Sequence, residues 1–271
     1  MDAMKSISAF TNDNTYSSPG RKISWIAKCF PTQYVYARLF NVIISAARKG
    51  KRGVYYDTDY LNDSIRIVRI MEKAGVRFYF ENLHVMKNIN SPCVIIANHM
   101  SMLETFILNI MILPWQKMTF VIKEDLLHYP VFKYVLLDRN PIAVTRKNPR
   151  KDLMTVLEEG VRRLKEGTSV AVFPQTTRSL NIDLSSFNSI GIKLALKANV
   201  PIVPLALKTD VWGNGKWIKD LGKIDPAKDV HFYFGEPVTP GGNKKVIHEQ
   251  IVSLIHSKLI QWKNTEVRKE S

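Results

Sequence analysis

The sequence predicts an α/β protein with a mostly parallel central sheet that helices cover on both faces. Two observations predict it. Past residue 53, short apolar runs alternate with longer segments of helical periodicity, and this alternation is typical of parallel sheets with helical connections. In addition, 271 residues with 45% hydrophobic side chains are enough to bury a large core, and no repeat, low-complexity tract or internal linker divides the chain. We therefore expect one α/β domain over residues 53–271.

The elements follow each other in a regular order. Short, mostly apolar runs of four to six residues predict strands at 76–80, 93–97, 118–122, 142–145, 169–173, 202–207 and 230–234. Residues with a period near 3.6 predict helices at 61–73, 101–113, 151–165, 189–197 and 244–262. The last helix is expected on the surface, with one apolar stripe of Ile247, Ile251, Leu254, Ile255, Leu259 and Trp262.

Residues 1–52 have a different character, being basic and rich in aromatic residues. They contain nine Lys and Arg residues against two Asp residues, a net charge of +7. Residues 29–47 are mostly apolar, but four polar residues or prolines interrupt them, so a spanning helix is marginal at best. Aromatic residues followed by the basic cluster 48–52 favour an amphipathic N-terminal helical segment that associates with an anionic membrane surface. A helix packed on the globular domain explains the same residues equally well, and the two interpretations are compatible.

Composition narrows the class of protein. The net charge of +15 implies an anionic partner, for which a bilayer, nucleic acid, phosphorylated metabolites and an acidic carrier protein all qualify. Two cysteines, Cys29 and Cys93, occur without Cys-x-x-Cys or Cys/His spacing, so the sequence predicts neither a disulfide framework nor a metal site. Residues 1–20 lack the apolar core of a secretory signal. No nucleic-acid motif is present, and we expect no nucleic-acid partner.

The stretch 98–104, Asn-His-Met-Ser-Met-Leu-Glu, is the most informative motif because it joins a predicted strand to a predicted helix. Ligands bind at this edge of α/β sheets. A neutral His99 can take a proton from a hydroxyl, and Glu104 on its other nitrogen would fix the tautomer. The alternative is structural, since Ser101 and Glu104 have the spacing of a helix capping box and His99 could be a hydrogen-bonded core histidine.

Cationic residues follow other predicted strands. Lys123 comes after the third strand, Arg146 and Lys147 after the fourth, and Arg178 shortly after the fifth. Because the carboxyl ends of parallel strands lie at one edge, these residues are expected to converge with His99. Their charge predicts a phosphate-binding rim.

Four sequence blocks occur in this order. Asn98, His99 and Glu104 form N-H-x-x-x-x-E, and residues 142–146 are an apolar run that ends in Arg146. The third block is Phe173, Pro174, Gln175, Thr176, Thr177, Arg178 and Ser179, and the fourth is the Pro-rich run 200–205, which includes Pro204. Together they resemble the glycerolipid acyltransferase superfamily, in particular the 1-acylglycerol-3-phosphate acyltransferases.

The resemblance implies a reaction. His99 would act as general base on the free hydroxyl of a lysophospholipid, with Glu104 orienting it, and the acyl group would come directly from acyl-CoA or acyl-carrier protein as co-substrate, with no metal or bound cofactor. Arg146, Arg178 and Lys123 would hold the acceptor phosphate, a role that suits bidentate guanidinium groups. Asn98, the other residues of the run 173–179 and Pro204 would line the substrate site. The enzyme would lie on the cytoplasmic face of a membrane as a peripheral or monotopic protein.

The third block departs from the family pattern F-P-E-G-T-R-S. Gln175 and Thr176 replace Glu and Gly, and the Gly of the second block is missing at Asn140 or nearby. A threonine occupies positive φ only at a real cost, so Thr176 is expected at ordinary negative φ. Losing the carboxylate at position 175 is expected to leave Arg178 freer for a substrate phosphate.

Two other functions fit part of the pattern. An acyl thioesterase would use His99 and Glu104 to activate water, and would release free fatty acid without any lysophospholipid. A non-catalytic, basic peripheral membrane protein would explain the charge, but it leaves the placement of His99 and Glu104 unexplained and would keep its function in His99→Ala.

Overall fold

The computed structural model describes residues 2–20, 23–129, 132–175, 177–179, 187–215 and 220–270. The elements in the amino-terminal half are α1 (Asp2–Thr11), β1 (Tyr16–Ser17), α2 (Trp25–Cys29), α3 (Pro31–Lys51), α4 (Asp57–Lys73), β2 (Phe78–Glu81), α5 (His84–Asn88), β3 (Val94–Ala97), α6 (Leu103–Ile112), β4 (Lys117–Lys123), the 3-10 helix η1 (Glu124–His128) and α7 (Phe132–Asp138). They are followed by β5 (Ile142–Val144), α8 (Pro149–Lys165), β6 (Thr168–Val172), α9 (Ile190–Ala198), β7 (Ile202–Lys208), β8 (Val230–Phe234) and α10 (Lys244–Glu270).

Within the described residues, eight strands form one sheet in the order β1-β2-β8-β7-β3-β6-β4-β5. The pairs β3–β7, β3–β6, β4–β6, β4–β5 and β2–β8 are parallel, whereas β1–β2 and β7–β8 are antiparallel. The predicted mostly parallel sheet is therefore confirmed, and all seven predicted strands are present. The strand β3 lies in the middle of the sheet, so its carboxyl end, where His99 follows, is surrounded by neighbouring strand ends.

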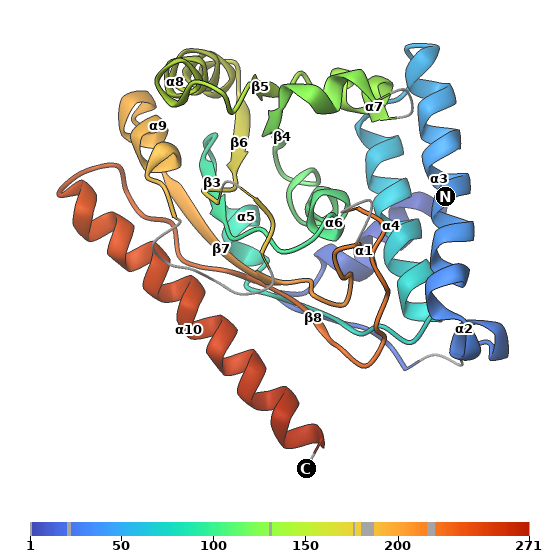
Figure 1. Cartoon of the computed structure of the whole chain (residues 1–271). Helices are drawn as coiled ribbons and strands as arrows, with labels where there is room; N and C mark the ends of the chain where they lie inside the picture. Colours follow the sequence, from blue (N-terminus) through green and yellow to red (C-terminus); the bar gives the residue numbers. More distant parts are fainter. Residues whose placement is uncertain are drawn as a thin grey trace.

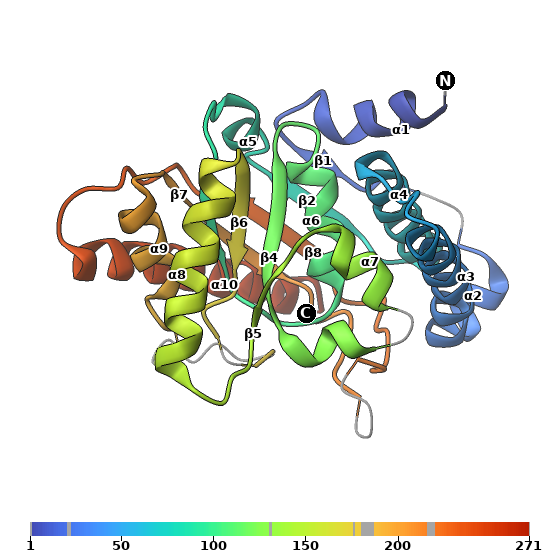
Figure 2. The same cartoon turned by 90° about the horizontal axis from the view of Figure 1, so that it is seen from above.

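Helices cover both faces of the sheet, as predicted (Figure 1). The side chains of β3 alternate: Val94 and Ile96 pack into a core with α8, α9 and α10, while Ile95 and Ala97 pack into a core with α1, α3, α4 and α6. All four residues are buried, because a central strand of a covered sheet meets apolar layers on both sides. Figure 2 shows α3 and α4 side by side at one end of the molecule, with α9 and α10 toward the other.

The predicted helices are present with shifted ends. In α8, the Asn148 side chain caps the helix by accepting from Lys151 N at 3.1 Å, and Pro149 fits the first turn, so the helix begins before the predicted Lys151. The helix predicted from Ser101 begins at Leu103. The surface helix α10 buries the predicted stripe at Ile247, Ile251, Ile255 and Trp262.

The first 52 residues are packed into the same body as the rest. The short strand β1, too short for a sequence pattern, extends the sheet beside β2, and Phe10 and Tyr16 are buried against Phe80. The helix α3 contacts α4 and α7. The interpretation of this segment as a packed helix is thus confirmed. Among the described helices, none combines the length and apolar character that crossing a bilayer requires.

Candidate functional site

His99 and Glu104 meet at the carboxyl end of β3. His99 Nδ1 lies 2.8 Å from Glu104 Oε1, although five sequence positions separate the two residues. The carboxylate is fully buried, whereas 15% of the histidine side chain is exposed. A hydrogen bond from Nδ1 to a carboxylate keeps the proton on Nδ1, so Nε2 carries the lone pair that can accept a proton. This is the arrangement that general-base chemistry needs.

Glu104 is held as a carboxylate by several donors. Its oxygens accept from the amides of Met100 (2.7 Å) and Ser101 (3.0 Å), and from the hydroxyls of Ser101 (2.9 Å) and Thr209 (2.6 Å). Burial raises the pKa of Glu104, but hydrogen bonding and attraction to His99, together with the Thr209 hydroxyl, outweigh it and lower the pKa. Glu104 therefore makes both contacts that the sequence suggested, because it accepts from the Ser101 amide as in a capping box and also from His99.

Residues of the third block contact both the ring and the backbone of His99. Phe173 stacks on the imidazole at 4.3 Å between ring centroids, and Phe120 continues the stack behind it. Oε1 of the buried Gln175 accepts a hydrogen bond from the His99 backbone amide at 2.6 Å. The Ser179 amide donates to the His99 carbonyl at 3.0 Å. Gln175 thus fixes the backbone of the histidine, a contact that a glutamate could also make.

Asn98 and Pro204 connect β3 to β7. The Asn98 amide group donates to Leu207 O at 2.7 Å and its oxygen accepts from Leu207 N at 2.9 Å, and the side chain is completely buried. Pro204 lies within β7, opposite Ile96 of β3. Both residues, predicted to bind substrate, therefore lie where β3 and β7 are joined, next to His99 at the end of β3.

Arg146 stands at a left-handed position two residues after the end of β5, with φ of 59°. Asp152 in the first turn of α8 holds this turn, accepting from Thr145 N at 2.9 Å and Arg146 N at 2.7 Å. Asn140 before β5 also has positive φ, 48°, which asparagine tolerates better than most residues and which explains how it can replace a family glycine. Burial and the positive charge of Arg178 lower the pKa of Arg146, so the two guanidinium groups lie near each other.

Arg178 does not have the freedom that the loss of a glutamate at position 175 suggested. Its guanidinium Nη2 forms an ion pair with Asp220, 42 residues further along the chain. The carboxylate comes from the segment between β7 and β8, which no local pattern links to the third block. The expectation of a freer Arg178 is therefore wrong, because a distant aspartate supplies the charge that position 175 lacks.

The remaining predicted residues are more peripheral. Lys123 lies at the same edge of the sheet, but its ammonium group pairs with Asp125. Thr177 is exposed, and Pro174 is buried with its carbonyl accepting from Asn188. The expectation for Thr176 falls outside the described residues.

Sequence reasoning missed three supporting residues. Thr209 carried a usable signal, because it is a polar residue that directly follows β7. Asp152 was also recognisable as an acid in the first turn of a helix. Asp220 gave no signal. Across the described ranges, no group of three or more His, Cys, Asp and Glu side chains is arranged to hold a metal ion.

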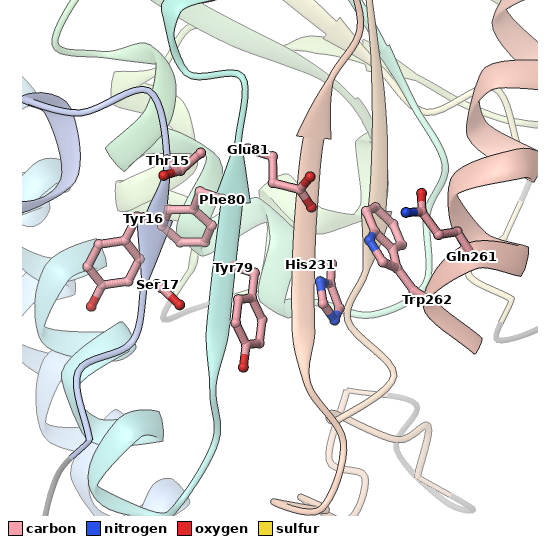
Figure 3. Close-up of a pocket in the computed structure, with 9 residues that line it drawn as sticks. All are labelled: Thr15, Tyr16, Ser17, Tyr79, Phe80, Glu81, His231, Gln261 and Trp262. Carbon is pink, nitrogen blue, oxygen red and sulfur yellow. The ribbon is translucent and has the colours of Figure 1, made fainter. Parts of the chain in front are cut away.

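A separate hollow of about 320 Å³ lies between β1, β2, β8 and α10 (Figure 3). The rings of Tyr79, His231 and Trp262 stack in a row along it, with centroids 4.9 Å apart in each pair. In the strand order, β8 and β2 lie beyond β7 from β3. None of the predicted site residues lines this hollow, so it is distinct from the His99 site.

Comparison with known proteins identifies the family. A family model described as Acyltransferase matches residues 76–208, the part that carries His99, Glu104, Arg146 and Arg178. A 1-acyl-sn-glycerol-3-phosphate acyltransferase of Pseudomonas aeruginosa is 34% identical over 153 residues, 56% of this chain and 57% of that protein. Residues 76–208 belong to the glycerolipid acyltransferase superfamily. The resemblance seen in the four blocks is thereby confirmed.

Two further members cover more of the chain. A probable 1-acyl-sn-glycerol-3-phosphate acyltransferase of Mycoplasma pneumoniae is 26% identical over 73% of this chain and 77% of its own length. The crystal structure of the 1-acyl-sn-glycerophosphate (LPA) acyltransferase PlsC from Thermotoga maritima has a TM-score of 0.64 and 18% identity, covering 88% of this chain and 97% of that one. At this identity the likeness concerns the fold. The match to the Pseudomonas aeruginosa protein spans little more than half of that protein's length.

Proposed function

We propose that this chain transfers a fatty acyl group from an acyl thioester to the free hydroxyl of a lysophospholipid. The acceptor is 1-acylglycerol 3-phosphate, the product is phosphatidic acid, and the donor is acyl-CoA or acyl-carrier protein. The observation that carries the proposal is His99, held through Nδ1 by the buried Glu104 at the edge of the sheet where Arg146 and Arg178 lie near each other. The names of the similar proteins support the acceptor.

The proposed reaction has the following steps. His99 Nε2 accepts the proton of the acceptor hydroxyl as that oxygen attacks the thioester carbonyl carbon. The carbon–sulfur bond then breaks, the thiolate leaves, and it receives the proton from His99. Glu104 stabilises the imidazolium that forms in between, because a buried carboxylate is already hydrogen-bonded to Nδ1. Holding the phosphate at the two arginines would bring the hydroxyl to the histidine, and such positioning supplies much of the acceleration.

A lipid-product assay tests the reaction. Purified protein is given acyl-CoA or acyl-carrier protein with a panel of lysophospholipids, and the products are identified by mass spectrometry. We expect phosphatidic acid from 1-acylglycerol 3-phosphate, and little free fatty acid when no acceptor is present. Release of fatty acid at the same rate without an acceptor would establish the thioesterase alternative instead.

Arg178→Ala should weaken use of the acceptor. Charge-assisted hydrogen bonds contribute about 1.5–3 kcal/mol, so kcat/KM for 1-acylglycerol 3-phosphate should fall roughly ten- to hundredfold. Arg178→Lys should recover part of the loss, because the charge remains while the fork of donors is lost. Arg162→Ala is the matched control, since Arg162 pairs with Glu159 on the surface of α8. Equal kcat/KM in Arg178→Ala and Arg162→Ala would remove Arg178 from the phosphate site.

We further propose that α2 and α3 place the enzyme on the cytoplasmic face of an anionic membrane as a peripheral or monotopic protein. Large apolar side chains are exposed there, including Trp25 at 74%, Phe30 at 54% and Phe40 at 60%. Basic residues on the same two helices, Lys28, Arg48, Lys49 and Lys51, suit anionic head groups. Apolar contact and charge attraction together would hold the enzyme at its lipid substrate.

The triple variant Trp25→Ser, Phe30→Ser, Phe40→Ser should bind anionic vesicles at least about tenfold more weakly, since each large apolar side chain contributes on the order of 1.5–3 kcal/mol when fully buried. Flotation with phosphatidylglycerol vesicles at low and high salt measures this. The control replaces Val246, Ile260 and Val267, exposed apolar residues of α10, by serine. Deleting residues 1–52 would be a poor test, because Phe10, Tyr16 and Leu39 belong to the core. The same loss of vesicle binding in both triple variants would contradict a membrane role specific to α2 and α3.

A further inference from the structure

The partner of Arg178 lies outside the four family blocks. Asp220 pairs with its guanidinium Nη2, and the two side chains are 19% and 30% exposed, respectively. Asp220 belongs to the chain between β7 and β8, the strand pair next to β3. A carboxylate from another part of the fold therefore contacts the group that, in the proposed function, binds the acceptor phosphate.

Several contacts independent of Arg178 fix the backbone around Asp220. Trp212 Nε1 donates to Asp220 O at 3.0 Å, and the Tyr36 hydroxyl donates to Gly222 O at 2.8 Å. The Tyr36 and Trp212 rings meet edge to face at 5.5 Å between centroids. Desolvation of the half-buried hydroxyl raises the pKa of Tyr36 to about 12, so it stays a donor at physiological pH. The position of Asp220 is thus set by the fold and not by a chance surface ion pair.

The helix α3 also holds this segment through Thr32. Ile224 N donates to the Thr32 hydroxyl at 3.1 Å, and Gly213 N donates to Lys223 O at 2.9 Å across the base of the segment. Gly222 approaches Gly213 so closely that a β-carbon at position 222 would lie 1.7 Å from Gly213 O. A chain of contacts therefore runs from α3, the proposed membrane helix, through Tyr36 and Asp220 to Arg178.

We propose that Asp220 is a positioning residue that fixes the Arg178 guanidinium for the acceptor phosphate and ties it to α3. This inference rests on the proposed function. Each of the two guanidinium groups has a carboxylate nearby, since Asp220 pairs with Arg178 and Asp152 attracts Arg146 while it accepts from the Arg146 backbone amide. Asp220 offsets part of the repulsion between the two guanidinium groups, and it fixes the orientation of the Arg178 guanidinium through Nη2. The tie to α3 sets the position of the phosphate site relative to the membrane helix.

The first test separates acceptor binding from turnover in the full-length protein. In Asp220→Ala, the KM for 1-acylglycerol 3-phosphate and the inhibition constant of the soluble head group sn-glycerol 3-phosphate should both rise roughly three- to tenfold. The value of kcat at saturating acceptor, and the KM for the thioester, should stay within about twofold. Asp220→Glu should restore part of the affinity. Asp57→Ala is the matched control, because Asp57 pairs with Arg139 outside the site.

Two further variants test how Asp220 acts. In the Arg178→Ala background, Asp220→Ala should have little additional effect, because Asp220 acts through Arg178. Tyr36→Phe should raise the same inhibition constant by a smaller factor, because it removes the bond to Gly222. Unchanged or lower KM and inhibition constant in Asp220→Ala would overturn the inference. A lower value would mean that the carboxylate competes with the phosphate.

Calorimetric titration with sn-glycerol 3-phosphate separates failure of this inference from failure of the proposed function. If the wild type transfers no acyl group to any lysophospholipid but binds the head group, and Asp220→Ala weakens that binding, the proposed reaction fails and the positioning role stands. If transfer occurs and Asp220→Ala binds the head group as tightly as the wild type, the positioning role fails and the reaction stands.

Discussion

Replacing His99 with alanine should lower acyl transfer by roughly 10²- to 10⁴-fold, the usual contribution of a general base. The loss should appear in kcat, because the imidazole acts on the proton in the transition state and does not hold the phosphate. The fold should persist, since the side chain is partly exposed and Glu104 keeps its other donors when the stacking on Phe173 and the hydrogen bond from His99 are lost. Phosphatidic acid formation and thermal unfolding are measured side by side.

His84→Ala is the matched control for this variant. His84 follows β2, which runs parallel to β8 and so opposite to β7 and β3, and this places it at the other edge of the sheet. Its transfer rate should equal that of the wild type. If His99→Ala keeps more than about a tenth of the activity, the general-base role is rejected. Such a loss of activity would be smaller than the contribution expected of a general base.

Glu104→Gln should lower both turnover and stability. The loss of charge removes the partner of the imidazolium, so kcat should fall on the order of tenfold or more. The cost in stability arises because both carboxylate oxygens accept hydrogen bonds, and the amide group of glutamine turns a donor toward one set of donors. An unsatisfied buried donor costs about 1–3 kcal/mol in the free energy of unfolding.

Thr209→Val separates the two effects of Glu104. It removes one donor to Oε2 while leaving the carboxylate and its contact with His99 in place. We expect a stability loss similar to that of Glu104→Gln, with kcat within about tenfold of the wild type. If the two variants lose turnover equally at equal stability, the charge of Glu104 has no catalytic role and its function is to cap α6.

The predicted strands were recoverable from sequence because a covered parallel sheet needs nearly continuous apolar runs. The run at Val94 to Ala97 is buried on both faces, so its composition reports the strand directly. The strand β1 was missed because two residues cannot show a period, and its place is decided by pairing with Tyr79 and Phe80. Helix ends shifted where a cap set them, as Asn148 does for α8.

The contacts of the candidate site also differ in whether the sequence could predict them. His99 and Glu104 are five residues apart across one strand-to-helix turn, so local geometry brings them together and the sequence was sufficient to predict the pair. The charge environment of Arg178 is not local. Removal of a carboxylate at Gln175 suggested a freer guanidinium, whereas the fold brings Asp220 to it from between β7 and β8.

The sequence by itself determined the family, the sheet and the histidine–carboxylate pair, because apolar periodicity and short motifs act over a few residues. Only the tertiary structure decided that Gln175 and Asn98 support His99 from beneath, that Thr209 completes the donors around Glu104, and that Asp220 joins Arg178 to α3. The physical reason is that Coulomb attraction and hydrogen bonding depend on distance in space, and the packing of helices on a sheet sets that distance for residues far apart in the chain.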